Sequence, residues 1–158
     1  MAYSIRNTAR AIILTHQHEV LLMRVKYPWL NDDLWVLPGG GIEEGEDIRS
    51  TIAREVFEET GATDIEIVGE AWRNERIIEA TNIHLKQKYF LVRAERFDAK
   101  PTNLSEPEMD WVREYRWWAV NSLATADILV EPERIAEGLQ NLISRGLPSV
   151  PIDIDVLS

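Results

Sequence analysis

The sequence predicts an α/β domain in which a mixed β-sheet has helices on both faces. Three observations support this: apolar runs separated by polar turns, an amphipathic helix directly after a glycine-rich loop, and a second amphipathic helix near the C-terminus. Elements in this order pack as layers around one core. Because 158 residues is the length of one domain, we expect a single domain over residues 1–158.

Seven segments have the composition of strands, with apolar or alternating residues bounded by turn-forming ones. They span residues 8–14, 20–25, 34–37, 64–71, 72–81, 85–94 and 111–120. The polar sequence HQHE separates the first two as a hairpin turn, and the fifth and sixth turn near Asn82. Residues 26–33 are predicted to be a loop, as are residues 95–110, which are polar and contain Pro101 and Pro107.

The first predicted helix follows three glycines, with Asp47 as its N-cap and Gly61 as its C-cap. Its apolar positions fall on one arc that we expect to face the core. They are Ile48, Ile52, Ala53, Val56 and Phe57.

Two further helices are expected in the C-terminal part. They span residues 121–126 and 132–145, and Gly146 would stop the second one. The apolar face of the second contains Ile135, Leu139, Leu142 and Ile143. The tail from residue 147 is expected either to pack along the surface or to exchange with a neighbour.

Glu55, Glu58 and Glu59 crowd one edge of the first helix at i, i+3, i+4 spacing. Like charges at this spacing destabilise a helix by roughly 0.2–0.5 kcal/mol per pair, and acids at a helix C-terminus oppose its dipole. A hard divalent cation such as Mg²⁺ or Mn²⁺ removes this conflict because it takes oxygen ligands. The alternative is an ordinary solvated acidic face.

Composition limits the partners and the chemistry. Acids outnumber bases 27 to 17 and the net charge is −10, which argues against nucleic acid or an anionic membrane as the main partner. There is no cysteine, which excludes disulfides and zinc–thiolate sites. No signal peptide or membrane span is visible, which makes a cytoplasmic protein the expectation.

The acidic residues belong to a longer pattern. Gly40 is followed after five residues by Glu46, and after seven more by the run REVFEETGA that begins at Arg54. This resembles the Nudix box, G-x5-E-x7-R-E-U-x-E-E-x-G-U with U apolar, at every defined position. Upstream, Trp35 before LPGG also resembles the usual approach to the box.

The resemblance implies an α/β/α sandwich in which the box forms a catalytic loop–helix–loop. It implies Glu58 and Glu59 as metal ligands, Glu55 as a further ligand or a general base, and the Gly39 carbonyl as another ligand. Structural roles would fall to Gly40, to Gly61 and to an ion pair between Glu46 and Arg54.

Some family members take their base from a later loop. Four acids of this chain are candidates: Glu106, Glu108, Asp110 and Glu114. Glu108 is the first choice because it lies in a loop that is free to move over the site.

The activity implied is Mg²⁺- or Mn²⁺-dependent hydrolysis of a nucleoside diphosphate linked to X, a small-molecule substrate. X stays open among nucleoside triphosphates, dinucleoside polyphosphates, ADP-ribose, sugar nucleotides and capped RNA ends. A non-catalytic nucleotide-sensing module is the alternative, although such modules usually carry a damaged box. An isoprenoid diphosphate isomerase would typically need a cysteine. A homodimer is compatible with the resemblance and is not established by the sequence.

Selectivity would come from residues outside the box. The candidates for base stacking are Tyr27, Trp29 and Trp72, for which core packing is the alternative. The candidates for phosphate contact are Arg24, Lys26, Arg73, Lys86, Lys88 and Arg93, each of which could instead be an ordinary solvated charge. His16 and His18 form an HXH pattern, which a polar turn explains as well as a metal site does.

Overall fold

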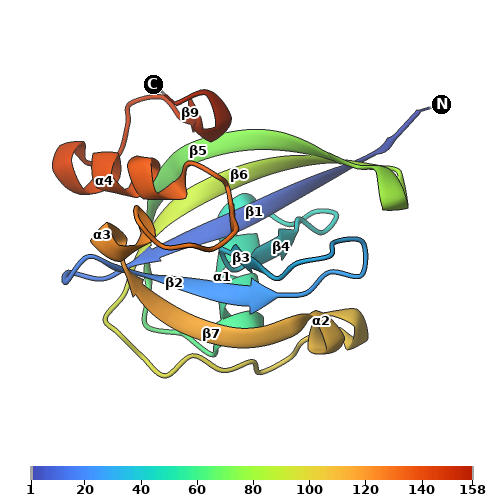
Figure 1. Ribbon diagram of the computed structural model, residues 1–158, viewed down its shortest axis with the longest axis horizontal. Helices are drawn as coiled ribbons and strands as arrows, with labels where there is room; N and C mark the ends of the chain where they lie inside the picture. Colours follow the sequence, from blue (N-terminus) through green and yellow to red (C-terminus); the bar gives the residue numbers. More distant parts are fainter. Residues whose placement is uncertain (1, 158) are drawn as a thin grey trace.

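A mixed sheet forms the centre of the computed structural model, which describes residues 2–157 (Figure 1). Within those residues the sheet has nine strands: β1 Ser4–Leu14, β2 Glu19–Val25, β3 Leu34–Val36, β4 Gly39–Gly41, β5 Glu66–Ile78, β6 Ile83–Arg93, β7 Val112–Ala119, β8 Val130–Glu131 and β9 Ile152–Asp153. The helices are α1 Ile48–Thr60, α2 Glu106–Trp111, α3 Val120–Leu123 and α4 Ile135–Arg145, with 3₁₀ turns η1 Glu79–Thr81 and η2 Ile154–Val156.

The strand order is β8-β3-β2-β1-β6-β5-β9, with β4 paired to β1 and β7 paired to β2. The β1–β6, β3–β8 and β5–β9 pairs are parallel and the other pairs are antiparallel, so the sheet is mixed as predicted. The long β1–β6 ladder places the start of the chain beside a strand about eighty residues later. The glycine-rich strand β4 pairs with β1, so this ladder positions it.

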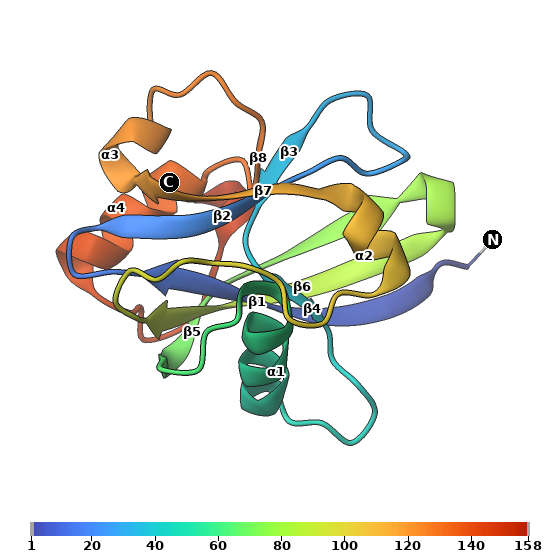
Figure 2. The same cartoon turned by 90° about the horizontal axis from the view of Figure 1, so that it is seen from below.

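The alternation of β1 buries its two faces in two different clusters. Ala11 and Ile13 pack with Val56 of α1, whereas Ile12 and Leu14 pack with Leu139 of α4. Figure 2 shows α1 on one side of the sheet and α3 and α4 on the other. The predicted class of α/β fold, with helices on both faces, is therefore confirmed. Each fully buried Val, Leu or Ile side chain among these stabilises the fold by roughly 1.5–3 kcal/mol.

The separate strands predicted over residues 64–71 and 72–81 were wrong, because β5 is one strand of 13 residues. Its register against β6 shifts twice, between Ile67 and Gly69 and between Glu70 and Trp72. Each shift is a β-bulge, which interrupts the inside–outside alternation of the side chains. This interruption resembles a strand boundary in the sequence, although the chain continues.

The C-terminal tail packs against its own chain. β9 pairs with β5, and Ile154 is fully buried against α4. A Cβ on Gly138 of α4 would lie 2.7 Å from both Ile154 and Trp72, so only glycine allows this close approach. Of the two expectations for the tail, packing along the surface is the one observed. No helix within residues 2–157 is long and apolar enough to cross a bilayer.

Candidate active site

Helix α1 begins and ends where the sequence predicts. The Asp47 side chain accepts a hydrogen bond from the Ser50 backbone N–H at 2.9 Å, which satisfies one of the free donors of the first turn. Gly61 adopts the left-handed conformation at φ 83° and its N–H donates to the Phe57 carbonyl.

The face of α1 that meets the sheet differs from the predicted apolar arc. Ala53 and Phe57 are exposed, whereas the side chains of Glu55 and Glu59 are buried together with Ile52. The helix is rotated so that two acids point inward. Apolar periodicity placed Ala53 and Phe57 toward the core and the acids at the edge of the arc, because it ranks positions by hydrophobicity alone.

A remote loop caps the C-terminal turn of α1. The backbone N–H of Thr102 donates to the Glu58 carbonyl at 2.8 Å, and that of Lys100 donates to the Thr60 carbonyl at 3.0 Å. The Thr102 hydroxyl adds a bond of 2.8 Å to the Phe57 carbonyl. The last turn contains no basic residue, so these bonds supply donors for carbonyls that have no partner within the helix.

The same loop leads into α2, a helix where the sequence predicts only a loop. Ser105 is its N-cap and forms a capping box with Glu108, whose carboxylate accepts from the Ser105 backbone N–H at 3.0 Å. Pro107 lies in the first turn, where a missing N–H costs nothing. The capping box therefore fixes the Glu108 side chain.

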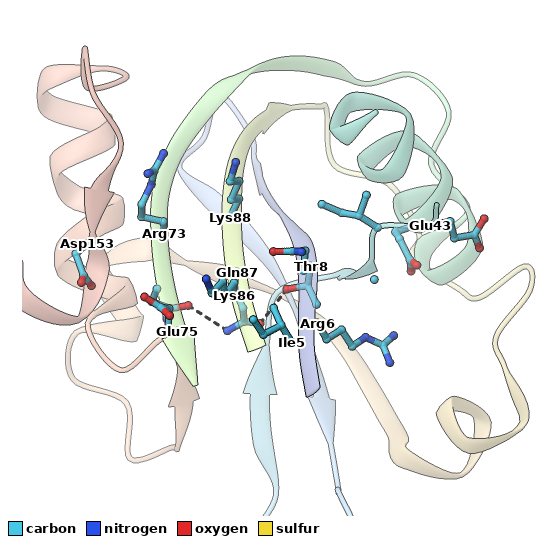
Figure 3. A pocket seen from close by; sticks show the side chains of 15 residues that line it. Ile5, Arg6, Thr8, Glu43, Arg73, Glu75, Lys86, Gln87, Lys88 and Asp153 are labelled. Atoms are coloured by element: carbon cyan, nitrogen blue, oxygen red, sulfur yellow. Dashed lines mark hydrogen bonds between the residues drawn. The ribbon is translucent and has the colours of Figure 1, made fainter. Parts of the chain in front are cut away.

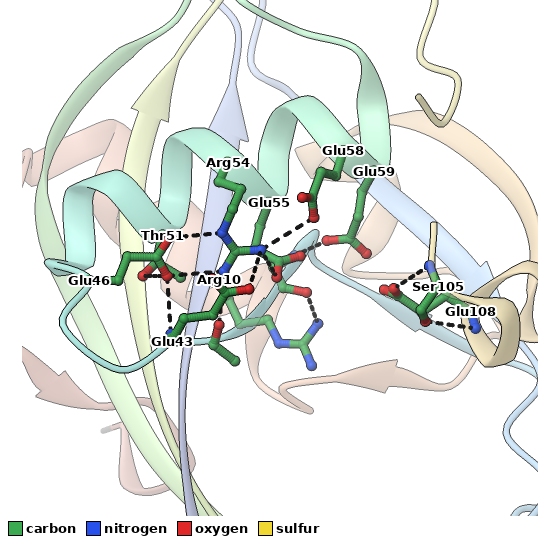
Figure 4. A network of polar contacts seen from close by, with 12 residues as sticks. Arg10, Glu43, Glu46, Thr51, Arg54, Glu55, Glu58, Glu59, Ser105 and Glu108 are labelled. Carbon is green, nitrogen blue, oxygen red and sulfur yellow. Dashed lines mark hydrogen bonds and ion pairs between the residues drawn. The ribbon is translucent and has the colours of Figure 1, made fainter. Parts of the chain in front are cut away.

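Three carboxylates from these two helices meet. Glu55, Glu59 and Glu108 each offer an oxygen, and the three atoms lie within 4.8 Å of one another (Figure 4). It is the single such group among residues 2–157. Oxygen atoms are the ligands that Mg²⁺ and Mn²⁺ prefer, so this donor set fits a hard divalent cation.

The other predicted acids lie elsewhere. Glu58 accepts from Arg54 Nη1 at 3.2 Å and stands outside the group of three. Glu114 is held by Arg24 at 3.0 Å and by Arg116 at 2.9 Å. Glu106 and Asp110 are exposed and also stand outside the group.

The glycine strand β4 lies against the buried acids. The Gly39 backbone N–H donates to a Glu59 oxygen at 2.6 Å. At Gly40 a Cβ would lie 2.5 Å from Glu55 Oε1, so the absence of a side chain makes room for that carboxylate. At Gly39 a Cβ would lie 2.2 Å from the Ala9 carbonyl oxygen. Both glycines therefore permit a close approach of backbone to neighbours.

Arg54 ties the preceding loop to the helix, as predicted. Its guanidinium forms a two-pronged pair with Glu46, Nε to Oε2 at 2.8 Å and Nη2 to Oε1 at 3.0 Å. These bonds, together with one from Thr51, lower the pKa of Glu46 to about 2. Arg54 also donates to Glu55 at 3.0 Å and to the Gly41 carbonyl at 3.1 Å, so one side chain connects loop, strand and acidic group.

The two inward-facing acids carry perturbed pKa values. Burial raises the pKa of Glu59 well above its ordinary value; Arg10 opposes the rise, and the Glu55 and Glu108 carboxylates add to it. Burial is also the main reason that the pKa of Glu55 is raised, against the opposing effect of Arg54. A bound cation would favour the ionised forms and reverse these shifts. The protein thus holds an acidic group that positive charge would stabilise.

Arg10 is a site residue that the sequence reasoning missed. Its Nη1 donates to the Leu37 carbonyl at 3.1 Å and to the Gly39 carbonyl at 3.4 Å, and its Nε donates to Gln87 at 3.3 Å. It therefore positions the strand whose carbonyl was predicted as a metal ligand. An arginine in the middle of the otherwise apolar run TARAIIL was the available signal.

The aromatic candidates separate into two groups. Trp72 is 1% exposed and belongs to the core, so its stacking role was wrong. Tyr27 and Trp29 stack on each other with ring centroids 4.9 Å apart, and Trp111 packs edge-on against both at 5.5 Å.

His16 and His18 lie in the β1–β2 turn and do not join the group of three acids.

A cavity of about 840 Å³ lies beside the acidic group (Figure 3). Its lining includes Arg6 and Thr8 of β1, Gly41, Glu43, Glu55, Arg73 and Glu75 of β5, Lys86, Gln87 and Lys88 of β6, and Asp153. Three of the predicted phosphate-contacting residues, Arg73, Lys86 and Lys88, are thus brought together at one cavity. Arg24, Lys26 and Arg93 are not among its lining residues.

Comparison with known proteins gives a consistent result. A protein-family model described as "NUDIX domain" matches residues 5–140. An RNA pyrophosphohydrolase of Campylobacter jejuni is 33% identical over 87 residues, which cover 50% of this chain and 56% of that protein. Nudix hydrolase 25 of Arabidopsis thaliana is 36% identical over 98 residues, covering 52% and 56%. The chain spans about half the length of the curated relatives it matches.

Solved structures agree on the fold. The crystal structure of the MutT protein from Methanosarcina mazei Go1 matches with a TM-score of 0.69 at 22% identity, covering 91% of this chain and 96% of that one. A MutT NUDIX hydrolase from Burkholderia pseudomallei matches with a TM-score of 0.61 at 24% identity, covering 87% and 97%. At these identities the likeness concerns the architecture alone, and it confirms the expected α/β/α sandwich.

Proposed function

We propose, from the premise that this chain belongs to the Nudix family, that it is a pyrophosphohydrolase acting on a nucleoside diphosphate linked to a further group. The relatives named RNA pyrophosphohydrolase and Nudix hydrolase support a hydrolase of this class. The observation that carries the proposal is the meeting of Glu55, Glu59 and Glu108 within 4.8 Å. Two of these carboxylates are buried, where ionised acids without a counter-charge are costly.

Mg²⁺ or Mn²⁺ would be held by Glu59 and by whichever of Glu55 and Glu108 does not serve as the base, with Glu58 and the Gly39 carbonyl as the further ligands that the family pattern favours. When bound, the metal neutralises phosphate oxygens and makes water a better nucleophile. Glu58 would join by turning away from Arg54, its partner at 3.2 Å. Arg10 Nη1 donates to the Gly39 carbonyl, and Arg54 Nη2 donates to the Gly41 carbonyl. Both arginines would therefore orient this set of ligands through the glycine strand.

The reaction is hydrolysis of a phosphoric anhydride. A water oxygen forms a bond to one phosphorus, the bond from that phosphorus to the bridging oxygen breaks, and the leaving phosphate keeps the electron pair. A carboxylate accepts the proton of the water. Glu108 is suited to this because α2 presents it opposite the two helix α1 acids. Glu55 is the other candidate for the base.

The test is formation of the two cleavage products from a nucleotide panel with Mg²⁺ or Mn²⁺, separated by chromatography, for wild type, Glu59→Gln and Glu66→Gln. Glu66 is exposed at the start of β5 and is the matched control for the same change of charge. We expect turnover of at least one substrate, loss of turnover in Glu59→Gln, and wild-type turnover in Glu66→Gln. A wild-type protein that binds nucleotides but hydrolyses none would overturn the proposal and indicate a sensing module.

A further inference from the structure

A network of polar side chains connects Arg10 with the C-terminal segment. Gln87 of β6 accepts a hydrogen bond from Arg10 Nε at 3.3 Å and donates one to Asn74 Oδ1 at 3.1 Å. Asn74 lies directly opposite Gln87 on β5, and its amide donates to Asp155 Oδ1 at 3.3 Å. Gln87 and Asn74 are each only 4% exposed. We refer to Arg10, Gln87, Asn74 and Asp155 as the polar network.

The two ends of the polar network fix the direction of its hydrogen bonds. A guanidinium can only donate and an ionised carboxylate can only accept. The amide oxygen of Gln87 must therefore face Arg10, and its NH₂ group must find an acceptor, which is the Asn74 oxygen. The NH₂ group of Asn74 then faces the carboxylates of Asp155 and Glu131, the second at 3.5 Å. Each buried amide is thus held in one orientation.

The far end of the polar network is anchored by an arginine. Arg76 of β5 donates from Nη2 to Asp155 Oδ1 at 2.9 Å and pairs with Glu131 at 2.8 Å. Asp155 belongs to η2 and Glu131 to β8, so the two carboxylates come from different segments of the C-terminal part. These contacts fix the acceptors that the Asn74 amide needs.

The near end of the polar network holds the backbone beside the acidic group. Arg10 Nη1 donates to the carbonyls of Leu37 and Gly39, and the Gly39 N–H donates to Glu59 at 2.6 Å. An arginine side chain has several rotatable bonds, so its guanidinium keeps one position only where its groups have fixed partners. Gln87 is the partner of Arg10 Nε. The place of Gln87 therefore influences the place of the backbone that holds Glu59.

Stability alone does not account for amides at this position. Tyr89, whose hydroxyl contacts both amides at 3.1 and 3.3 Å, packs in the same core cluster as Trp72 and Leu139. Apolar side chains of similar shape can replace a buried polar pair at little cost in stability, whereas the loss of one partner leaves the other unsatisfied. A role in holding Arg10 explains why polar side chains occupy a place that apolar ones could fill.

We infer that Gln87 is a positioning residue of the active site: it holds Arg10 and, through Arg10, the backbone that sets Glu59 for a divalent cation. The inference rests on the proposed function, because it takes Glu59 as a metal ligand. Asp155 makes the C-terminal segment the distant support of the same site. The effect of Gln87 on the cation is indirect and passes through Arg10 and Gly39.

The test measures the Kd for Mg²⁺ by calorimetry, without substrate, for wild type, Gln87→Met and Gln87→Glu. Methionine keeps the length of the side chain and removes the acceptor, whereas glutamate keeps an oxygen for Arg10 Nε. We expect the Kd to rise roughly tenfold in Gln87→Met, at the lower end of the effect of losing a residue that orients a metal ligand. In Gln87→Glu the Kd should stay near the wild-type value.

Two further measurements separate positioning from stability. Exchange of the Gly39 N–H with deuterium, without metal, should be faster in Gln87→Met, because the backbone that meets Glu59 is held less firmly. The control is Thr15→Val, which removes a buried hydroxyl that accepts from the Glu19 N–H at 3.2 Å in the β1–β2 turn. Thr15→Val should lower the urea midpoint and leave the Kd for Mg²⁺ unchanged.

A destabilised Gln87→Met with wild-type Kd and wild-type exchange at Gly39 would overturn the inference, because the polar network would then serve stability alone. A Kd for Gln87→Glu as high as that for Gln87→Met would also overturn it. If Gln87→Met does not fold, Asp155→Ala replaces it, since Asp155 is partly exposed. Its Kd should also rise, and an unchanged Kd would refute the inference. Wild type that binds Mg²⁺ and hydrolyses no nucleotide would refute the proposed function and leave this comparison of variants standing.

Discussion

Substitution of Gly40 by alanine tests whether the observed position of Glu55 is required. The φ angle of Gly40 is not positive, so alanine brings no backbone strain. The new Cβ would instead lie 2.5 Å from Glu55 Oε1, where ordinary contacts begin at 3.4 Å. The carboxylate must therefore retreat by about 0.9 Å, and a misplacement of about 1 Å at a reacting centre costs on the order of 100-fold in rate.

We expect Gly40→Ala to lose about 100-fold in kcat while its free energy of unfolding stays the same or rises by about 0.4–1 kcal/mol, because alanine restricts the unfolded chain. The assay is turnover of the best substrate beside urea unfolding. Gly45→Ala is the control with the opposite signature. Gly45 has φ 77° and open space around it, so alanine there should cost stability and leave turnover per folded molecule unchanged. Wild-type turnover in Gly40→Ala would refute the reasoning.

Three further predictions concern stability. Thr102→Val should lower the free energy of unfolding by about 0.5–1.5 kcal/mol, since it removes the hydroxyl bond to the Phe57 carbonyl; unchanged urea midpoints would contradict this. The pKa of Glu46 is about 2 when folded and about 4.3 when unfolded, so its stabilisation is present above pH 4.3 and is lost as pH falls through 2. Unfolding of wild type and Glu46→Gln should therefore differ at neutral pH and converge at acid pH. Mg²⁺ at 100 times its Kd should stabilise wild type by about 2.7 kcal/mol and Glu59→Gln by much less, as calorimetric melting would measure; equal shifts would exclude Glu59 as a ligand.

The ends of helix α1 could be predicted from the sequence because they depend on residues that are neighbours in the chain. The caps of α1 at Asp47 and Gly61 are chemical requirements of the helix ends, and both were correct. The capping box of α2 was also present, as Ser105 followed three residues later by Glu108, but two prolines suggested a loop. Pro107 is compatible with a first helical turn, so the prolines were the weaker signal.

Features that depend on distant partners could not be predicted. Glu59 turns inward because its carboxylate accepts a hydrogen bond from the backbone N–H of Gly39, which lies twenty residues earlier in the chain. The continuity of β5 follows from pairing with β6, which tolerates two bulges. Of the four downstream acids, Glu108 is the one that lies beside Glu55 and Glu59, and its catalytic role stays a prediction. Glu108 was predicted to lie in a loop that is free to move, whereas the capping box of α2 holds its side chain in place.

The loop that caps α1 also has a consequence for how the molecule opens. The backbone N–H groups of Thr102 and Asn103 both donate to the carbonyl of Glu58, one of the three acids along the edge of α1. Their exchange with deuterium should therefore be as slow as that of the end of α1, although they lie in a segment without regular structure. Deuterium uptake at these two amides would therefore report opening of the C-terminal turn of α1, which carries Glu59 of the acidic group.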